Sequence, residues 1–405
     1  MGSVELADIE SARERIAGVA LITPVIHSQS FTRLLGREVW LKAENLQRTG
    51  SFKIRGALNA LSLLAPERRA AGVVAASAGN HAQGVALAAR ELGLHSTVFM
   101  PATAAIPKVE ATRAYGADIR LGGDDLGAAV DAATAFADQT GAWFVHPYDD
   151  PAIVAGQGTL GLELADQVPD ADTVVIPVGG GGLIAGSSLA LRSRLPGLRI
   201  VGVQSAAAPT YVASRRAGEP VSGPVGATVA DGIAVGRACR MAYDLIEAHV
   251  DDLVTIDDGE ATEAVALLLE RAKLLVEPSG AVTLAATLRG AVGPGDGPVV
   301  VVLSGGNVDL LVVGDLVRAG LEERGRFMAF TVRVRDVPGQ LARVLEVVGA
   351  NGGNIVDVEH HREGSGLPYG QVEIHVAVAT RSSDHQRQIV EALQAGGLDV
   401  QRGHA

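Results

Sequence analysis

Short runs of β-branched residues alternate with stretches of helical composition between residues 73 and 303. This alternation is typical of parallel strands joined by crossover helices, so it restricts the chain to the α/β class of folds. Ligand sites in such sheets lie beyond the carboxyl ends of the strands. We therefore expect residues 77–81, 179–182 and 304–307, which follow three of the strands, to converge on one site. The strands predicted within this stretch are residues 73–75, 97–100, 118–121, 143–146, 173–178, 199–203 and 299–303.

A second pattern follows residue 326, and a chain of 405 residues is long enough for more than one domain. It predicts the βαββαβ order of a ferredoxin-like unit, with a last short strand near Asp399. The charged stretch 322–326 separates the patterns, so we expect a catalytic domain of residues 1–322 and a second domain of residues 327–405. The other predicted elements are residues 327–335, 338–349, 354–361, 371–378 and 383–394.

Charge and composition exclude several classes of partner. The formal net charge is −12 and the chain has no long basic run, so we expect no nucleic-acid partner. The acidic start, with Glu5 and Asp8, does not resemble a signal peptide, and no apolar run is long enough to span a bilayer. The one cysteine, Cys239, cannot form an internal disulfide. We expect a cytoplasmic protein without a membrane partner.

Four consecutive glycines follow the predicted strand 173–178, namely Gly179, Gly180, Gly181 and Gly182. Without side chains in the way, backbone N–H groups and a helix N-terminus can close around a phosphate. A tight turn with positive φ is the alternative, but such a turn needs one glycine rather than four. The run therefore predicts a phosphate site, without indicating which phosphate.

A dinucleotide site is the main rival, because Gly180, Gly182 and Ala185 match its glycine pattern. That site also needs an acidic residue at the end of the next strand to bind a ribose. This chain has Val203 and Gln204 there, so we place the dinucleotide interpretation second.

Lysine chemistry has only four candidates, because the chain contains lysine at positions 42, 53, 108 and 273 alone. Lysines usually lie at the surface with the amine in solvent. Lys42, on a predicted strand, fits that surface interpretation, and Lys108 is expected to be exposed. Lys273 lies near the end of a predicted helix, a favourable place for a cation.

Lys53 is different, because its neighbours are apolar. Burial lowers the pKa of a lysine and favours the neutral amine that forms a Schiff base. Ser51 is expected to cap a helix that begins at Phe52. By elimination, Lys53 is the predicted reactive lysine.

Several motifs in a fixed order resemble those of the threonine dehydratase (threonine ammonia-lyase) family, over roughly the first 320 residues. Their combination and order are far more specific than any one motif. The matching stretches are residues 42–47, 51–53, 77–81, 146–150, 156–159, 179–183 and 304–307.

The resemblance implies a tryptophan-synthase-β-like, two-lobed α/β catalytic region with parallel sheets and pyridoxal 5'-phosphate as its cofactor. Lys53 would bind the cofactor aldehyde and later move the substrate α-proton, Asn80 would bind the ring oxygen, and Ser304 would face the pyridine nitrogen. A hydroxyl cannot hold that nitrogen protonated as a carboxylate would. The implied cofactor-binding residues are Phe52, Lys53, Asn80, Gly179, Gly180, Gly181, Gly182, Leu183 and Ser304.

The resemblance also implies a set of substrate-binding residues: Ser77, Ala78, Gly79, His81 and Glu277. For Glu277, a surface carboxylate at a helix end is an equally good interpretation of the sequence. Related serine racemases have Ser where this chain has Ala78, so we expect little racemisation.

We predict no metal site. The same relatives bind a divalent cation where this chain has Gln204, Ala208 and Thr210, and hard cations prefer charged oxygens. His360 and His361 are neighbours on a predicted strand, so their side chains point to opposite faces and cannot chelate one ion together.

The tail beyond Phe327 resembles an ACT domain, a small module that senses amino acids. Its implied effector-binding residues are Asp336, Pro338, Gly339, Gln340, Leu341, Asn354 and Ile355. The alternative is a dimerisation module that binds nothing, because a fold predicts its ligand only loosely. Either interpretation suits a homo-oligomer, a dimer or a tetramer.

The resemblance predicts a threonine ammonia-lyase that converts L-threonine to 2-oxobutanoate and ammonia, with L-serine as a side substrate and an amino acid as regulator. Its setting would be isoleucine biosynthesis or threonine catabolism. The alternatives are a serine dehydratase, a threonine or cysteine synthase, and a sensor that has lost its chemistry. The intact Lys53, Asn80 and Ser304 speak against a sensor.

Overall fold

The computed structural model describes residues 4–362 and 367–403 and divides the chain into two compact units, residues 1–313 and 314–405. The helices are α1 (Leu6–Ile16), α2 (Gln29–Leu35), α3 (Lys53–Ser62), α4 (Pro66–Arg69), α5 (Asn80–Glu91), α6 (Ile106–Ala114), α7 (Leu126–Thr140), α8 (Pro151–Gln167), α9 (Gly182–Arg194), α10 (Thr210–Ala217), α11 (Arg240–His249), α12 (Asp258–Leu267), α13 (Pro278–Leu288), α14 (Leu310–Glu323), α15 (Gln340–Ala350) and α16 (Ser383–Ala395), with short turns η1 (Glu44–Leu46), η2 (Asp231–Ile233) and η3 (Leu268–Ala272). The strands are β1 (Val25–His27), β2 (Val39–Ala43), β3 (Val73–Ala76), β4 (Ser96–Met100), β5 (Asp118–Leu121), β6 (Trp143–Phe144), β7 (Thr173–Pro177), β8 (Arg199–Ser205), β9 (Asp252–Ile256), β10 (Val299–Leu303), β11 (Phe327–Arg335), β12 (Asn354–His361), β13 (Gln371–Ala379) and β14 (Asp399–Gly403).

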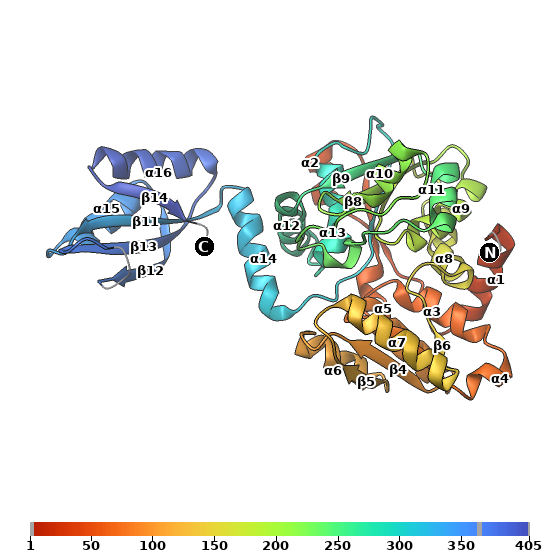
Figure 1. Cartoon of the computed structure of the whole chain (residues 1–405). Coiled ribbons are helices and arrows are strands. Elements are labelled where there is room, and N and C mark those ends of the chain that lie inside the picture. Colours follow the sequence, from red (N-terminus) through yellow and green to blue (C-terminus); the bar gives the residue numbers. More distant parts are fainter. Residues whose placement is uncertain (1–3, 363–366, 404–405) are drawn as a thin grey trace. The chain divides into compact units, whose positions relative to one another are not determined.

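The larger sheet of the first unit has the strand order β1-β2-β10-β7-β8-β9. All its neighbouring strands are parallel except β1, which pairs antiparallel with β2 at the edge. Every residue of β7 and β10 is buried, as expected for parallel strands with helices on both faces. Helices α8 and α9 share a core with β7, and α13 packs along β7, β8, β9 and β10 (Figure 1).

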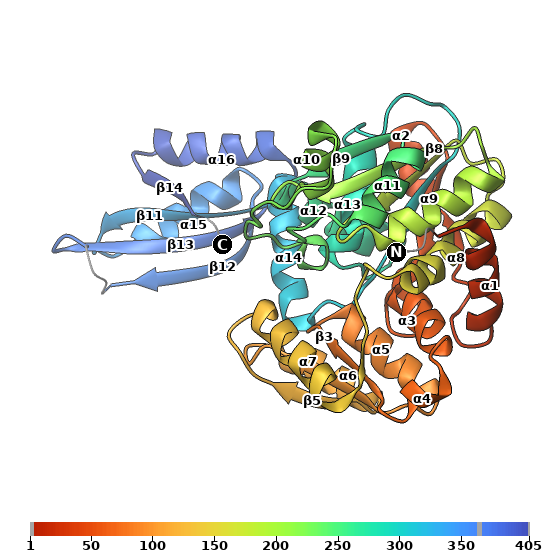
Figure 2. The same ribbon diagram turned by 45° about the vertical axis from the view of Figure 1, so that its right-hand side comes forward.

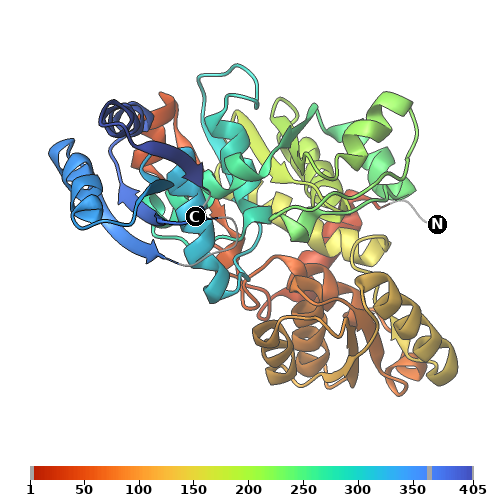
Figure 3. The same ribbon diagram turned by 60° about the vertical axis from the view of Figure 1, so that its left-hand side comes forward.

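The smaller sheet is parallel throughout, with the order β5-β4-β3-β6. Helix α7 covers one face, where Ala129 and Ala133 pack against Val74. Helices α3 and α5 lie on the face of Val73 and Ala75. This lobe is orange to yellow-brown in Figure 3, next to the yellow and green larger lobe. The predicted two-lobed α/β architecture is therefore confirmed.

The predicted strands agree with the structure to within two residues at each end, and one of the larger differences is that β6 ends at Phe144 rather than at residue 146. The reason is local: Nδ1 of His146 accepts a hydrogen bond from the N–H of Asp149 at 2.8 Å, which turns the chain out of the sheet. The short edge strand β1 and the outer strand β9 were not among the predicted strands.

The second unit contains an antiparallel sheet with the order β12-β13-β11-β14, which confirms the βαββαβ order (Figure 2). Helices α15 and α16 cover one face, where Val344 and Ile389 join a core with Phe330 and Val376. The compact unit begins at residue 314, within α14. The domain assignment 1–322 and 327–405 stays a prediction.

Among the described helices, none combines the length and the apolar character needed to cross a membrane.

Candidate active site

One cavity of about 500 Å³ in the first unit lies where the carboxyl ends of β3, β7 and β10 meet. The three segments that follow these strands line it together, from both lobes. All the residues predicted to bind cofactor or substrate are among its lining, namely Phe52, Lys53, Ser77, Ala78, Gly79, Asn80, His81, Gly179, Gly180, Gly181, Gly182, Leu183, Glu277 and Ser304.

Lys53 is the first residue of α3, and its Nζ donates a hydrogen bond to the carbonyl oxygen of Pro147 at 3.1 Å. Burial lowers the pKa of Lys53 to about 8, and the carboxylate of Glu277 opposes this shift. A lower pKa places more of the amine in its neutral, nucleophilic form near neutral pH. This agrees with the expectation from its apolar neighbours.

The capping prediction for Ser51 is wrong. The N-cap residue of α3 is Phe52, and Ser51 Oγ is buried with no hydrogen-bond partner among the described residues. The backbone of Ser51 instead pairs with Gly305. Backbone N–H groups at the start of α3 find other acceptors. The N–H of Phe52 donates to the carbonyl oxygen of Ser304, and the N–H of Gly56 donates to Gln157 Oε1.

Two further lysines differ from their predictions. Lys42 is fully buried rather than at the surface, because its Nζ lies 2.6 Å from the carboxylate of Glu163. Lys108 is half-buried in the cavity wall, with its Nζ 3.6 Å from Asp231. Lys273 does lie at a helix end as predicted, and its Nζ donates to the carbonyl oxygen of Glu270.

The glycine run leaves no room for side chains. A Cβ on Gly180 would lie 2.2 Å from the ring of Tyr148, and one on Gly179 would lie 2.9 Å from Ile233 Cα. Gly181 has a φ of 87° and is the N-cap of α9. The first N–H groups of a helix have no intrahelical acceptor, so α9 presents donors to the cavity.

Tyr148 is a cavity residue that sequence reasoning did not single out, although it lies in the matching stretch 146–150. Only the fold brings its ring against Gly180. The hydroxyl of Tyr211 supports the same turn from outside the cavity, donating to the carbonyl oxygen of Gly180 at 2.9 Å.

Glu277 lies inside the cavity wall, 8% exposed, so the surface interpretation is wrong. Its Oε1 accepts a hydrogen bond from Asn80 Nδ2 at 2.8 Å. Burial and the charge of Asp231 raise the pKa of Glu277 to about 7, and the bond from Asn80 opposes the shift. A carboxyl and an amine that both titrate near neutral pH therefore face one cavity.

His81 is buried, and its Nε2 lies 2.8 Å from the carbonyl oxygen of Val145. Burial and the charge of Lys53 lower the pKa of His81 to about 3. The imidazole is therefore neutral at physiological pH, and it orients the start of α5 rather than adding a charge to the cavity.

Gln204, at the position where a cation site was considered, is buried and has a structural role. Its Oε1 accepts hydrogen bonds from the N–H groups of Tyr211 and Val212, both at 2.9 Å, at the start of α10. Within residues 4–362 and 367–403, no three His, Cys, Asp or Glu side chains form a cluster suited to a metal ion. His360 and His361 lie on β12 as predicted, both exposed.

The structure does not bring the predicted effector residues together within one chain. Residues 336–341 lie where β11 ends and α15 begins. Asn354 and Ile355 begin β12 and pair with Ala379 and Val378, level with the start of β11. Eight steps along β11 separate the two groups, roughly 26 Å at the usual rise of a strand.

A cavity of about 680 Å³ lies in the second unit beside α14. It is on the face of the sheet away from α15 and α16, since residues such as Ala329 and Ala377 alternate with the core residues. None of the predicted effector residues lines it.

Comparison with protein families agrees with both units. Residues 16–305 match the family described as pyridoxal-phosphate dependent enzymes, and residues 329–395 match the ACT domain. The first match alone covers more than half of the chain. The chain belongs to the pyridoxal-phosphate-dependent enzymes. Its cofactor is pyridoxal phosphate, and it carries a C-terminal ACT domain.

Curated and structural relatives of this pyridoxal-phosphate enzyme narrow the comparison. The L-threonine ammonia-lyase of Geobacter sulfurreducens is 44% identical over 392 residues, which is 97% of this chain and 98% of the relative. The catabolic L-threonine dehydratase of Escherichia coli is 41% identical over 315 residues, 77% of this chain and 96% of the relative. Maize serine racemase has a similar structure, with a TM-score of 0.74 and 34% identity over 79% of this chain and 99% of its own.

The residues of the cavity fit this cofactor. The turn at residues 179–182 and the N-terminus of α9 suit its phosphate, because a Cβ would fill the space and the N–H groups carry no intrahelical bonds. Asn80 Oδ1 is buried without a partner among the described residues, so it is available to a polar ligand group. Lys53 supplies an amine for the aldehyde.

Proposed function

We propose that this enzyme is a threonine ammonia-lyase, which converts L-threonine to 2-oxobutanoate and ammonia and accepts L-serine as a side substrate. The observation that carries the proposal is the Lys53 amine, with its pKa lowered to about 8, in the same cavity as the glycine turn. The names of the relatives from Geobacter sulfurreducens and Escherichia coli support the choice of threonine.

The chain's own residues suit β-elimination. Bound pyridoxal phosphate supplies an electron sink that stabilises negative charge at the substrate α-carbon. Lys53, whose pKa lies near the working pH, would lie near that carbon and would take up the α-proton. The turn at residues 179–182 would hold the phosphate, and Asn80, which Glu277 orients, would hold the ring oxygen. Ser304 would face the ring nitrogen as a neutral partner, and residues 77–81 would surround the substrate.

Racemisation of serine is the second candidate, favoured by the similarity to maize serine racemase. Moving a proton to the second face of the α-carbon needs an acid there. Ala78 offers no hydroxyl at that position, so we propose that racemisation is slower than elimination.

Coupled assays of 2-oxobutanoate from L-threonine and of pyruvate from L-serine test the proposal across substrate concentrations. We expect both products, with a preference of about 10- to 200-fold or less, because one methyl group supports only modest discrimination. D-serine formed as fast as pyruvate would mean that the enzyme is a racemase. The absence of both products from the cofactor-loaded enzyme would refute the ammonia-lyase.

We further propose that the ACT domain binds an amino acid and regulates a cytoplasmic homo-oligomer with a role in isoleucine biosynthesis. The two groups of implied effector residues lie at opposite ends of β11. A single site that contains both groups therefore needs two copies of the chain.

A further inference from the structure

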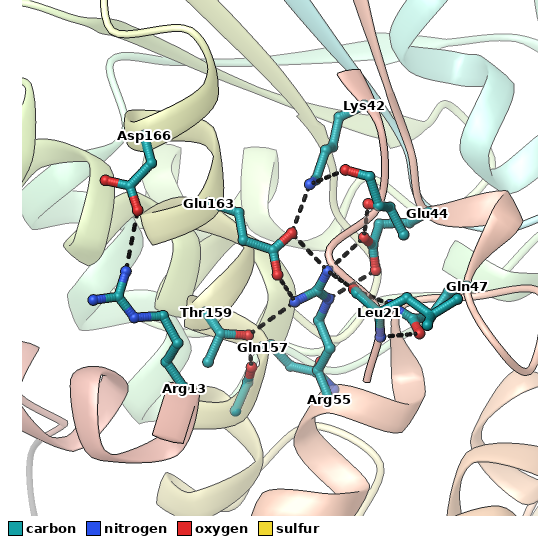
Figure 4. Close-up of polar contacts among 12 residues, drawn as sticks. Arg13, Leu21, Lys42, Glu44, Gln47, Arg55, Gln157, Thr159, Glu163 and Asp166 are labelled. Carbon is teal, nitrogen blue, oxygen red and sulfur yellow. Dashed lines mark hydrogen bonds and ion pairs between the residues drawn. The ribbon is translucent and has the colours of Figure 1, made fainter. Parts of the chain in front are cut away.

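A cluster of four charged side chains surrounds the start of α3, and the proposed mechanism does not use it (Figure 4). Lys42, Glu44 and Arg55 are 0% exposed and Glu163 is 7% exposed. We call these four residues the buried charge network. Two cations balance two anions, so the network is neutral as a whole.

Arg55 is the centre of the network. Its Nη1 and Nη2 donate to the two carboxylate oxygens of Glu163 at 2.5 and 3.0 Å, while its Nε and Nη2 donate to the oxygens of Glu44 at 2.8 and 2.7 Å. Thr159 Oγ1 and the carbonyl oxygen of Leu21 accept further bonds. A guanidinium that is bidentate to two carboxylates has one orientation only.

Lys42 joins the network from β2. Its Nζ donates to Glu163 at 2.6 Å, to the carbonyl oxygen of Thr23 and to Gln167. Burial lowers the pKa of Lys42, against the attraction of Glu163 and Glu44. Replacing a buried ion pair by apolar residues often costs no stability, so stability alone is a weak reason for such a network.

Arg55 follows Lys53 by two residues in the first turn of α3. This turn is held on its other sides as well, by the bond from the Phe52 N–H to Ser304 and by the bond from the Gly56 N–H to Gln157. Arg55 neither lines the cavity nor contributes to the pKa shift of Lys53, whose causes are burial and Glu277. Any effect of Arg55 on Lys53 must therefore act through the position of the turn.

We propose that Arg55 is a positioning residue: its bonds to Glu44 and Glu163 within the buried charge network fix the first turn of α3 so that the Lys53 amine meets the cofactor aldehyde. The inference rests on the proposed role of Lys53. It predicts that a small change at Arg55 weakens the covalent attachment of the cofactor to Lys53. Binding of the phosphate should not weaken, because residues 179–182 belong to other elements.

Affinities for two ligands separate these contributions. Pyridoxal phosphate and pyridoxamine phosphate share a ring and a phosphate, but only the first has an aldehyde for Lys53. Both dissociation constants would be measured with the cofactor-free full-length protein, together with its thermal unfolding. The wild type should bind pyridoxal phosphate more tightly than pyridoxamine phosphate. The reference variant is Lys53→Ala, which should remove this preference for pyridoxal phosphate.

Arg55→Lys keeps the charge but loses the bidentate geometry. We expect Arg55→Lys to raise the dissociation constant of pyridoxal phosphate about tenfold or more and that of pyridoxamine phosphate less than about twofold. The reason is that a misplacement of a reacting group by about 1 Å can cost up to 100-fold in its reaction. Thr159→Val is a milder variant in case Arg55→Lys does not fold, because it removes one hydrogen bond from Arg55. It should also weaken the binding of pyridoxal phosphate more than that of pyridoxamine phosphate. Lys42→Met is the control, because it disturbs the same network away from α3 and should leave the preference intact.

The inference is wrong if folded Arg55→Lys or Thr159→Val retains the full preference for pyridoxal phosphate. It is also wrong if each of Arg55→Lys and Lys42→Met raises the dissociation constants of both ligands by the same factor. The network would then have a structural role only. A full preference in Lys53→Ala would instead refute the proposed role of Lys53 itself.

Discussion

At the scale of single residues, the four lysines show how far the environment decides chemistry. Lys42 pairs with Glu163, Lys108 lies near Asp231, and Lys273 donates to a carbonyl oxygen at a helix end. Lys53 instead lines the cavity, where its amine donates to the carbonyl oxygen of Pro147. Burial lowers its pKa and Glu277 partly restores it. Lys53 is thus the lysine of the chain whose amine is both buried and available.

This balance predicts a pH dependence. Because a protonated amine cannot attack an aldehyde, uptake of pyridoxal phosphate by the cofactor-free protein should accelerate as pH rises, with a midpoint near 8 rather than near the ordinary 10.5. Glu277→Gln removes the charge that raises the pKa of Lys53, so its midpoint should move below that of the wild type. Stopped-flow absorbance measures both midpoints. The control is Glu247→Gln, which removes a carboxylate from the surface ion pair with Arg215. A midpoint that stays in place or moves upward in Glu277→Gln would contradict the coupling.

At the scale of elements, the turn between β7 and α9 suits a phosphate because its four residues have no side chains. Tyr148, from the segment before α8, fills the space beside Gly180 where a Cβ would lie. The phosphate site therefore depends on a contact between two segments that are distant in sequence.

Gly180→Ala tests this contact, because its methyl group would collide with the ring of Tyr148. We expect at least about tenfold weaker binding of pyridoxal phosphate and of inorganic phosphate, since the cradle must open. Gly197→Ala is the matched control, with nothing within 4 Å of the new Cβ. Equal affinities in the two variants would show that residues 179–182 do not hold the phosphate.

Local patterns predicted most elements of this chain, and long-range contacts account for the errors. The strand β11 begins and ends where its alternation of apolar and polar residues does, because one face packs on helices. The burial of Lys42 was not predictable from its neighbours, since its partner Glu163 lies on α8, 121 residues further on. Ser51 likewise pairs through its backbone with Gly305, so a local capping rule did not apply.

At the scale of the whole molecule, we expect the two units to serve separate roles, catalysis and regulation. The Escherichia coli dehydratase matches this chain over 315 residues, which is 96% of its own length and about the size of the first unit, residues 1–313. We therefore expect a chain that ends at Glu323 to remain yellow and active.

The same truncation should abolish any response to amino acids. We expect isoleucine or valine to change the rate or the half-saturating threonine concentration of the full-length enzyme about 5- to 150-fold, the usual range of allosteric coupling. Calorimetry and initial rates with each of the twenty amino acids measure this, and the truncated enzyme is the control. If none binds outside the active site, or if the truncated enzyme responds equally, the ACT domain is an assembly module.

The central claim is that Lys53 carries the cofactor, and borohydride reduction tests it most directly. Reduction fixes pyridoxal phosphate to whichever lysine holds it, and only four positions are available. After tryptic digestion, mass spectrometry should find the added mass on the peptide of residues 49–55, with cleavage blocked at Lys53. The added mass on the peptides that contain Lys42, Lys108 or Lys273, or on none, would contradict the account.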